Sequence, residues 1–184
     1  MAYIATRAAR LAGQEISRAF DRPDLVKVGE KGHNDYVTNI DKNVEQVIID
    51  SLQSTYPDHR FTGEETVNED INPDAEYEWV IDPIDGTTNF VHGIPHFCIS
   101  IACLHKGKLE HGIILDPLRQ EEFVASRGAG CTLNGHRVRV SARPSLDGAV
   151  ISTGGRENGE VAVKQSAIYE HLLNEKAIMR QAGS

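Results

Sequence analysis

Residues 79–90 read Trp-Val-Ile-Asp-Pro-Ile-Asp-Gly-Thr-Thr-Asn-Phe, an apolar strand pattern that runs directly into two carboxylates and a Gly-Thr-Thr-Asn sequence. Because Pro83 cannot donate to a sheet ladder, we expect the strand that begins at Tyr77 to break after Asp82. In an unbroken strand, Asp82 and Asp85 would point to opposite faces of the sheet. A turn at Pro83 brings both carboxylates to the same place.

Two carboxylates held close together repel each other unless a proton or a cation lies between them. Mg²⁺ prefers such oxygen ligands and completes its coordination shell with water and phosphate. The backbone amides of Gly86 and Thr87, just past the turn, are placed to form an anion-binding concavity. Asp-Pro or Asp-Gly alone is an ordinary turn signal, but both together after a buried strand favour a cation site that also binds phosphate.

The pattern around this segment predicts helices layered on a largely antiparallel sheet, an α+β or layered α/β fold. Apolar residues at helical spacing predict one helix over residues 4–20 and a second over residues 40–52. The polar stretch between them, residues 31–39, is typical of a loop or a hairpin. A third helix is predicted over residues 161–173, and a strand-like run at residues 177–180 has no evident partner. The predicted strands are residues 60–63, 77–82, 96–104, 109–116, 121–126 and 149–152.

The composition of the 184 residues is that of an ordinary globular chain, with 40% hydrophobic and 25% charged residues. A net charge of −8 argues against direct nucleic-acid binding, which needs a basic surface. The apolar run at residues 97–104 is far too short to span a bilayer, and the N-terminus lacks the apolar core of a signal peptide. We expect a soluble, cytoplasmic protein without a membrane partner, whose three cysteines are buried, reduced thiols.

Two further acidic segments accompany the central one. Gly63-Glu64-Glu65 closes the short strand at residues 60–63, and Asp41 falls in the first turn of the second helix, where it favours the helix dipole. Taken alone, adjacent glutamates are common on surfaces, and helix capping is the default explanation for Asp41.

Together, these segments resemble the inositol monophosphatase family, and the bacterial extragenic-suppressor branch most closely. The central segment, residues 79–90, matches the first signature motif of the family in full. The other segments that carry the resemblance are residues 35–41, 63–65, 95–97, 116–117, 127–130 and 133–135.

The resemblance implies the family's layered α/β/α/β/α sandwich and Mg²⁺-dependent hydrolysis of a phosphate monoester. Myo-inositol monophosphate is the default substrate, and fructose 1,6-bisphosphate or a nucleotide 3′-phosphate is the alternative. A homodimer, two or three Mg²⁺ ions and sensitivity to lithium are implied as well.

The site residues implied by the resemblance fall into four groups. Those implied to hold Mg²⁺ are Glu64, Asp82, Asp85 and the backbone carbonyl of Ile84. Those implied to position and deprotonate the attacking water are Asp41 and the hydroxyl of Thr87. Those implied to contact phosphate or substrate are Ile84, Asp85, Gly86, Thr87, Gly183 and Ser184. The accessory residues are Lys31, in the loop between the first two helices, and Glu65.

The sequence also departs from the family. Members are longer and carry a second motif, Trp-Asp-x-x-Ala-Gly, whereas the only tryptophan here, Trp79, belongs to the first motif. We therefore expect residues 1–184 to form a single phosphatase domain without the C-terminal part of the family fold and with an incomplete second metal site.

Two other functions compete with that of a metal-dependent phosphatase. A haloacid-dehalogenase-like phosphatase needs Asp-x-Asp-Gly-Thr, whereas the spacing here is Asp-x-x-Asp-Gly-Thr, which misplaces the second carboxylate. A non-catalytic role with RNA polymerase or transcription factors is the alternative from a different functional class, and it rests on family analogy alone.

Overall fold

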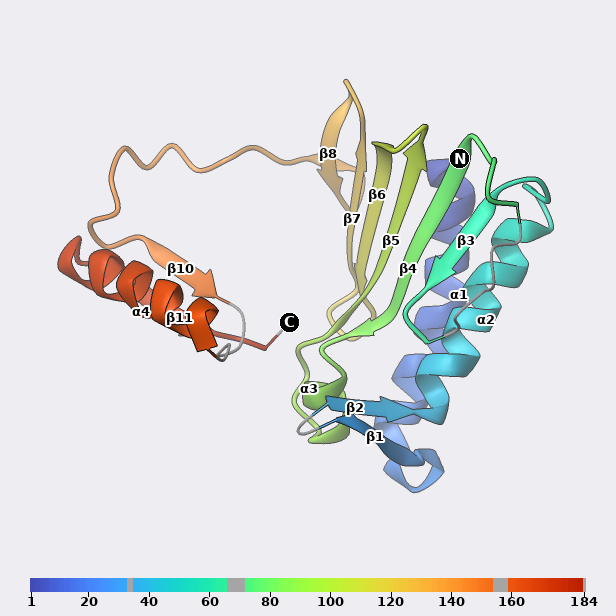
Figure 1. The fold of residues 1–184 in the computed structure, drawn as a ribbon, viewed down its shortest axis with the longest axis horizontal. Helices are drawn as coiled ribbons and strands as arrows, with labels where there is room; N and C mark the ends of the chain where they lie inside the picture. The colour runs from blue at the N-terminus through green and yellow to red at the C-terminus, as the bar shows by residue number, and fades with distance from the viewer. Residues whose placement is uncertain (33–34, 66–71, 154–158, 184) are drawn as a thin grey trace. The chain divides into compact units, whose positions relative to one another are not determined.

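The computed structural model describes residues 1–32, 35–65, 72–153 and 159–183, and the chain forms two compact units, residues 1–138 and 139–184 (Figure 1). The elements of the first unit are, in chain order, α1 (Ala2–Asp21), η1 (Pro23–Leu25), β1 (Val28–Gly32), β2 (Asp35–Thr38), α2 (Asn39–Gln53), β3 (Arg60–Gly63), β4 (Tyr77–Asp85), α3 (Thr87–Val91), β5 (Cys98–His105), β6 (Lys108–Asp116), β7 (Glu121–Ser126), β8 (Gly130–Leu133) and β9 (His136–Arg137).

A sheet in the order β3-β4-β5-β6-β7-β8-β9 forms the centre of the first unit. Every neighbouring pair is antiparallel except β3 and β4, which run parallel. The helices α1 and α2 lie side by side and pack on this sheet, α1 on β5, β6 and β7 and α2 on β4 (Figure 1). The prediction of helices on a largely antiparallel sheet is therefore confirmed. The polar stretch before α2 forms an antiparallel hairpin of β1 and β2.

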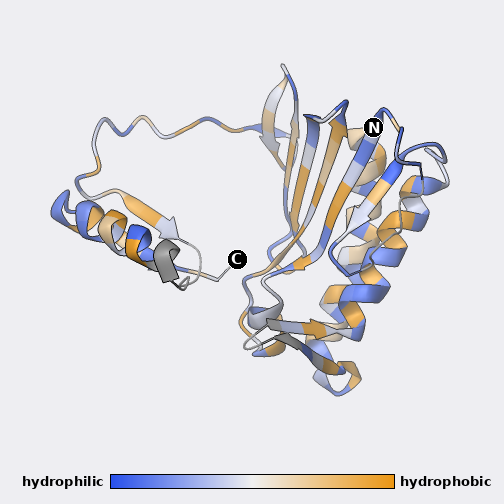
Figure 2. Ribbon diagram, viewed as in Figure 1, coloured by the Kyte–Doolittle hydropathy of each residue, from blue (hydrophilic) through white to orange (hydrophobic). Residues whose placement is uncertain are grey.

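The buried side of α1 consists mostly of small residues, which lets the helix approach its neighbours closely. A methyl group on Gly13, for example, would lie 3.1 Å from Leu115 and 3.2 Å from Pro117. Leu11, on the same helix, is 50% exposed. Hydrophobic and hydrophilic residues alternate along α1 and α2, as in helices buried on one side (Figure 2). Among the described residues, no helix is long and apolar enough to cross a membrane.

The strand β4 continues through Pro83 to Asp85, so the predicted break after Asp82 was wrong. Asp82 pairs with Ser100 and Asp85 with Cys98, which places three steps on β4 opposite two steps on β5. This one-residue excess is a β-bulge, a feature that accommodates proline within a sheet. Because Ser100 and Cys98 share one face of β5, the bulge brings Asp82 and Asp85 to the same face of the sheet.

Four stacked rings line one end of the sheet: His105 on Tyr77, Tyr77 on His59 and His59 on Tyr56, with ring centroids 4.4, 4.8 and 4.8 Å apart. The fully buried indole of Trp79 donates from Nε1 to Nδ1 of His59 over 3.0 Å. Since Nδ1 accepts this bond, His59 is neutral, and burial lowers the pKa of its imidazole.

The three cysteines are free thiols, as expected, but only Cys103 is buried. Burial raises the pKa of the Cys103 thiol to about 11, so it behaves as an apolar core residue. Cys98 and Cys131 are partly exposed, contrary to the expectation that all three would be buried.

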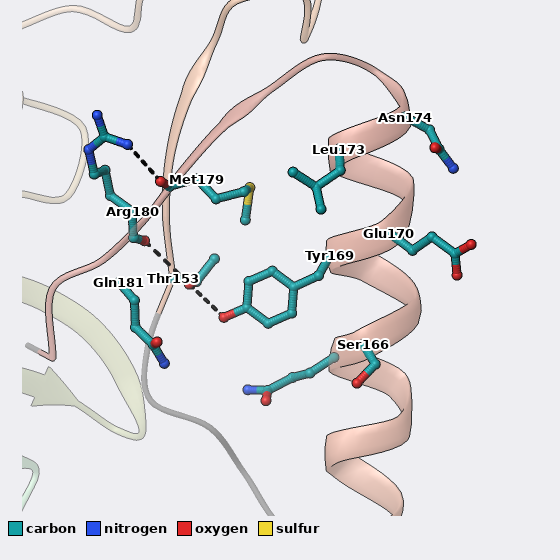
Figure 3. Close-up of a pocket in the computed structure, with 10 residues that line it drawn as sticks. Thr153, Ser166, Tyr169, Glu170, Leu173, Asn174, Met179, Arg180 and Gln181 are labelled. Carbon is teal, nitrogen blue, oxygen red and sulfur yellow. Dashed lines mark hydrogen bonds between the residues drawn. The ribbon is translucent and has the colours of Figure 1, made fainter.

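The second unit consists of β10 (Val150–Thr153), α4 (Gly159–Asn174) and β11 (Ile178–Gln181). The two strands pair in parallel, so the strand-like run near residue 180 has β10 as its partner, reached through α4. The Thr153 hydroxyl lies 2.7 Å from the hydroxyl of Tyr169, which ties β10 to α4 beside a hollow lined by both elements and β11 (Figure 3).

Candidate metal and phosphate site

Asp82 lies at the bulge of β4, in surroundings that disfavour the charged form of its carboxyl group. Its Oδ1 atom is buried and has no hydrogen-bond partner among the described residues. Burial, the charge and the hydrogen bond of Glu64, and the charge of Asp85 together raise the pKa of Asp82 to about 8. A carboxylate in such a place is stabilised by a proton or by a cation.

Glu64 reaches this place because β3 runs parallel to β4. Gly63 pairs with Ile81, and the N–H of Glu64 donates to the carbonyl of Ile81 over 3.1 Å, which extends the ladder beyond the last residue of β3. Glu64 and Asp82 line the same hollow, together with residues of β5 such as Ser100.

Asp85 follows on the same face as Asp82 and is held by its neighbour on β5. The thiol of Cys98 donates to Asp85 Oδ2 over 3.6 Å. Among the described residues, no three or more His, Cys, Asp or Glu side chains already converge as a finished metal-binding group. The observations that fit a hard cation are the unpartnered oxygen of Asp82 and the mutual repulsion with Glu64 and Asp85, whose carboxylate oxygens are the donors such ions prefer.

Asp41 uses its two carboxylate oxygens for different purposes. Oδ2 accepts from the backbone N–H of Thr38 over 2.8 Å and from the Thr38 hydroxyl. The Thr38 hydroxyl oxygen in turn accepts from the backbone N–H of Asp41, which completes the capping box at the start of α2. Oδ1 lies 3.3 Å from the hydroxyl of Thr87. Asp41 is only 1% exposed, and burial raises the pKa of its carboxyl group. The same side chain therefore caps the helix and reaches the segment after β4.

Thr87 and Gly86 form the start of α3, directly after Asp85. The Thr87 hydroxyl lies 2.9 Å from the carbonyl of Ile84, so one lone pair of that carbonyl faces the hydroxyl. Gly86 has a φ of 98°, in the left-handed region that favours glycine. As the N-cap of α3 it begins a turn whose first amides have no acceptor within the helix.

The remaining predicted residues are Lys31, Glu65, Gly183 and Ser184. Lys31 lies in the strand β1 rather than in a loop, and its side chain is outside the described part of the structure. Gly183 is exposed in the second unit with a φ of 85°, and Ser184 lies outside the described residues. The N–H of Glu65 donates to Oε2 of Glu45 over 3.0 Å.

Glu45 did not emerge from the sequence as a site residue. It is completely buried and lies one helical turn after Asp41 on α2. The available signal was a pair of acidic residues four apart on the side of the helix that also carries Val44 and Ile48, because a carboxylate on an apolar helix face is unusual.

Known proteins resemble this chain along its whole length. The profile of the inositol monophosphatase family matches residues 1–184. The "Nus factor SuhB" of Pseudomonas aeruginosa is 56% identical over 188 residues, an alignment that covers all of this chain and 69% of that protein.

Two solved structures extend the likeness to the fold. The extragenic suppressor protein SuhB of Bartonella henselae superposes with a TM-score of 0.92 at 35% identity, over 99% of this chain and 70% of that one. Inositol monophosphatase-II of Staphylococcus aureus, solved with inositol monophosphate bound, superposes with a TM-score of 0.76 at 27% identity, over 98% of this chain and 64% of that one. With the family profile matched along its whole length and the fold shared with solved members, the chain belongs to the inositol monophosphatase family.

Proposed function

We propose that this protein hydrolyses a phosphate monoester with the help of Mg²⁺, and that myo-inositol monophosphate is its substrate. The observation that carries the proposal is the buried, unpartnered Oδ1 of Asp82 among the carboxylates of Glu64 and Asp85. These residues, with the carbonyl of Ile84, would hold Mg²⁺. When bound, the ion would neutralise charge on the phosphate and lower the pKa of a coordinated water.

Asp41 and Thr87 are the residues we assign to the attacking water. The Thr87 hydroxyl has one proton to donate and two lone pairs that accept. When its proton points to Oδ1 of Asp41, a lone pair of Thr87 is free to accept a proton from water. Because burial raises the pKa of Asp41, this carboxylate accepts the Thr87 proton more readily than an exposed aspartate would.

The start of α3 supplies the groups we assign to the phosphate. The left-handed conformation of Gly86 turns the chain away from β4, and amides without helical acceptors follow at this point. Backbone amides in such a turn favour an oxyanion. Phosphate transfer requires mostly positioning and charge neutralisation, which amides and carboxylate-held cations provide.

The substrate assignment draws on the relatives. The Staphylococcus aureus structure contains inositol monophosphate, and the family is named for this activity. Fructose 1,6-bisphosphate and nucleotide 3′-phosphates are the alternatives to assay beside it. The homodimer and the sensitivity to lithium remain predictions.

Phosphate release from inositol 1-phosphate, measured with and without Mg²⁺, tests the proposal. We expect release by the unmodified chain to depend on Mg²⁺, and Thr87→Val to lower the rate about 100-fold or more because it removes the hydroxyl between water and Asp41. Thr88→Val, the same change at the exposed neighbouring residue, is the matched control and should retain the rate. Equal rates for the two variants would contradict the role of Thr87, and release unaffected by Mg²⁺ would contradict the proposed reaction.

A second candidate function is a non-catalytic role with the transcription machinery. It is favoured by the name Nus factor, carried by the 56% identical Pseudomonas aeruginosa relative. Purified bacterial RNA polymerase, with and without its elongation factors, would be passed over the immobilised protein. Retention that persists in Thr87→Val would support this role as separate from catalysis, and no retention under any of these conditions would count against it.

A further inference from the structure

The helix α2 carries two buried carboxylates, and each reaches a different segment of the candidate site. Asp41 is 1% exposed and lies 3.3 Å from the hydroxyl of Thr87, in the segment that follows β4. Glu45, one turn further along, is 0% exposed and accepts from the N–H of Glu65, in the segment that follows β3, over 3.0 Å. A single helix thus contacts both chain segments that carry the predicted ligands.

Gly63 shows how closely the chain after β3 lies against Glu45. A Cβ atom built on Gly63 would overlap the carboxyl group of Glu45, closer than real Cβ atoms approach any neighbour. The φ of Gly63 does not lie in the left-handed region, so its backbone conformation is open to other residues. Glycine at this position therefore leaves room for the Glu45 carboxyl group, which a Cβ atom would displace.

Glu64 is held between these two contacts. On one side, Gly63 packs against the Glu45 carboxyl group and pairs with Ile81 of β4. On the other side, the N–H of Glu65 is bound by Glu45 Oε2. Two restraints from one side chain, on both neighbours of Glu64, leave its backbone little freedom and keep its carboxylate beside Asp82.

Stability alone does not account for a carboxylate in this position. Transfer of a carboxylate from water to a protein interior costs several kcal/mol, and an apolar residue of similar size is often at least as stabilising. The neighbours of Glu45 on the buried face of α2 include Val44 and Ile48, which are apolar. A group that costs stability and orients the segment carrying a predicted metal ligand is typical of a functional position.

We propose that Glu45 is a positioning residue, which fixes residues 63–65 so that Glu64 is pre-organised to bind Mg²⁺ together with Asp82. This inference rests on the proposed Mg²⁺-dependent function. In this proposal, α2 aligns two segments of the site. Glu45 contacts the segment after β3, and Asp41 contacts the segment after β4.

The test is Mg²⁺ affinity, measured by titration calorimetry on the full chain, for Glu45→Ala and Glu45→Gln. We expect Glu45→Ala to weaken Mg²⁺ binding at least about 10-fold, the usual cost of losing a group that orients a metal ligand. Glu45→Gln should retain most of the affinity, since its amide oxygen still accepts from the Glu65 N–H. The matched control is Asp50→Asn, which neutralises an exposed carboxylate on the same helix and should leave the affinity unchanged.

Hydrogen exchange of the Glu65 amide provides a readout that does not require metal. Exchange should be faster in Glu45→Ala and unchanged in Asp50→Asn. A folded Glu45→Ala variant with normal Mg²⁺ affinity would overturn the proposal. If the unmodified chain binds no Mg²⁺, the proposed function itself fails. Equal Mg²⁺ binding by the unmodified chain and Glu45→Ala would instead overturn only the role of Glu45.

Gly63→Ala keeps the proposal testable should Glu45→Ala fail to fold. The added methyl group displaces the Glu45 carboxyl group and should weaken Mg²⁺ binding, and the double variant Gly63→Ala/Glu45→Asp, whose shorter side chain makes room, should recover part of the loss. Normal affinity in Gly63→Ala, or no recovery in the double variant, would overturn the proposal.

Discussion

Replacing Asp82 with asparagine is expected to stabilise the metal-free protein and to abolish its response to Mg²⁺. In the metal-free state the Asp82 carboxylate is partly buried, repelled by Glu64 and Asp85, and has one oxygen without a partner. Asparagine removes the charge at nearly constant volume. We expect a gain of about 1–2 kcal/mol near pH 8, at the low end for a buried unsatisfied group because part of the side chain reaches solvent. This corresponds to an increase in Tm of about 2–4 °C per kcal/mol.

The pH dependence of this effect has a defined sign. The pKa of Asp82 is raised from 3.8 to about 8, so the folded state binds the proton more tightly than the unfolded state does. The stabilising contribution is therefore complete below about pH 4 and is lost as the pH rises through 8. The stability of the unmodified chain should fall relative to that of Asp82→Asn across this window, while the contributions of titrating groups that do not interact with Asp82 cancel in the comparison.

Thermal unfolding between pH 4 and pH 8, with and without Mg²⁺, measures both parts of this prediction. Mg²⁺ should raise the Tm of the unmodified chain and leave Asp82→Asn unchanged, and the variant should release phosphate at least about 100-fold more slowly. Asp50→Asn, an exposed carboxylate changed in the same way, should match the unmodified chain in all three measurements. A metal-free Asp82→Asn variant that is less stable than the unmodified chain at pH 8 would show that Asp82 is not strained by its neighbours.

Replacing Trp79 with alanine is expected to be the most destabilising single change in the first unit. Its side chain is 0% exposed, and its Nε1 atom donates to His59 within the row of stacked rings. Truncation leaves a large cavity and deprives His59 of its donor, and it should cost about 3–5 kcal/mol. Because β4 also carries Asp82, loss of this anchor should reduce Mg²⁺ binding as well.

Urea unfolding followed by far-ultraviolet circular dichroism measures the loss, since the variant has no tryptophan to report by fluorescence. Leu109→Ala, a truncation at a side chain that is 54% exposed on β6, is the control and should change stability by less than about 0.5 kcal/mol. A cost for Trp79→Ala no larger than that of the control would mean that the ring row does not anchor β4.

The sequence predicted the regular strands better than their irregularities. The bounds of β3 and β7 were confirmed because short apolar or alternating runs ended at clear turn residues. The bulge in β4 was not foreseen, because proline signals the loss of a ladder donor and does not reveal whether the strand ends or absorbs an extra residue. The partner of β11 depended on a parallel pairing across α4, which local sequence patterns do not encode.

The candidate site shows the same division. Asp82 and Asp85 could be predicted from the compact motif at residues 79–90, whereas Glu64 and Asp41 were predicted only through the resemblance to the family, because adjacent glutamates and an aspartate at a helix start have ordinary explanations. Glu45 was missed because a glutamate in a helix is ordinarily exposed, and only the folded chain shows Gly63 and Glu65 against it. Its contribution depends on tertiary contacts between α2 and the end of β3, which no single segment of sequence contains.

The bulge at Pro83 also limits how this segment can change during evolution. With the bulge in place, three steps along β4 bring Asp85 to the same face as Asp82. One residue more or fewer between them would turn one carboxylate toward the helices, into an apolar core where an unpaired charge is costly. Insertions and deletions between the two aspartates are therefore selected against in a single step, whatever residues they add or remove.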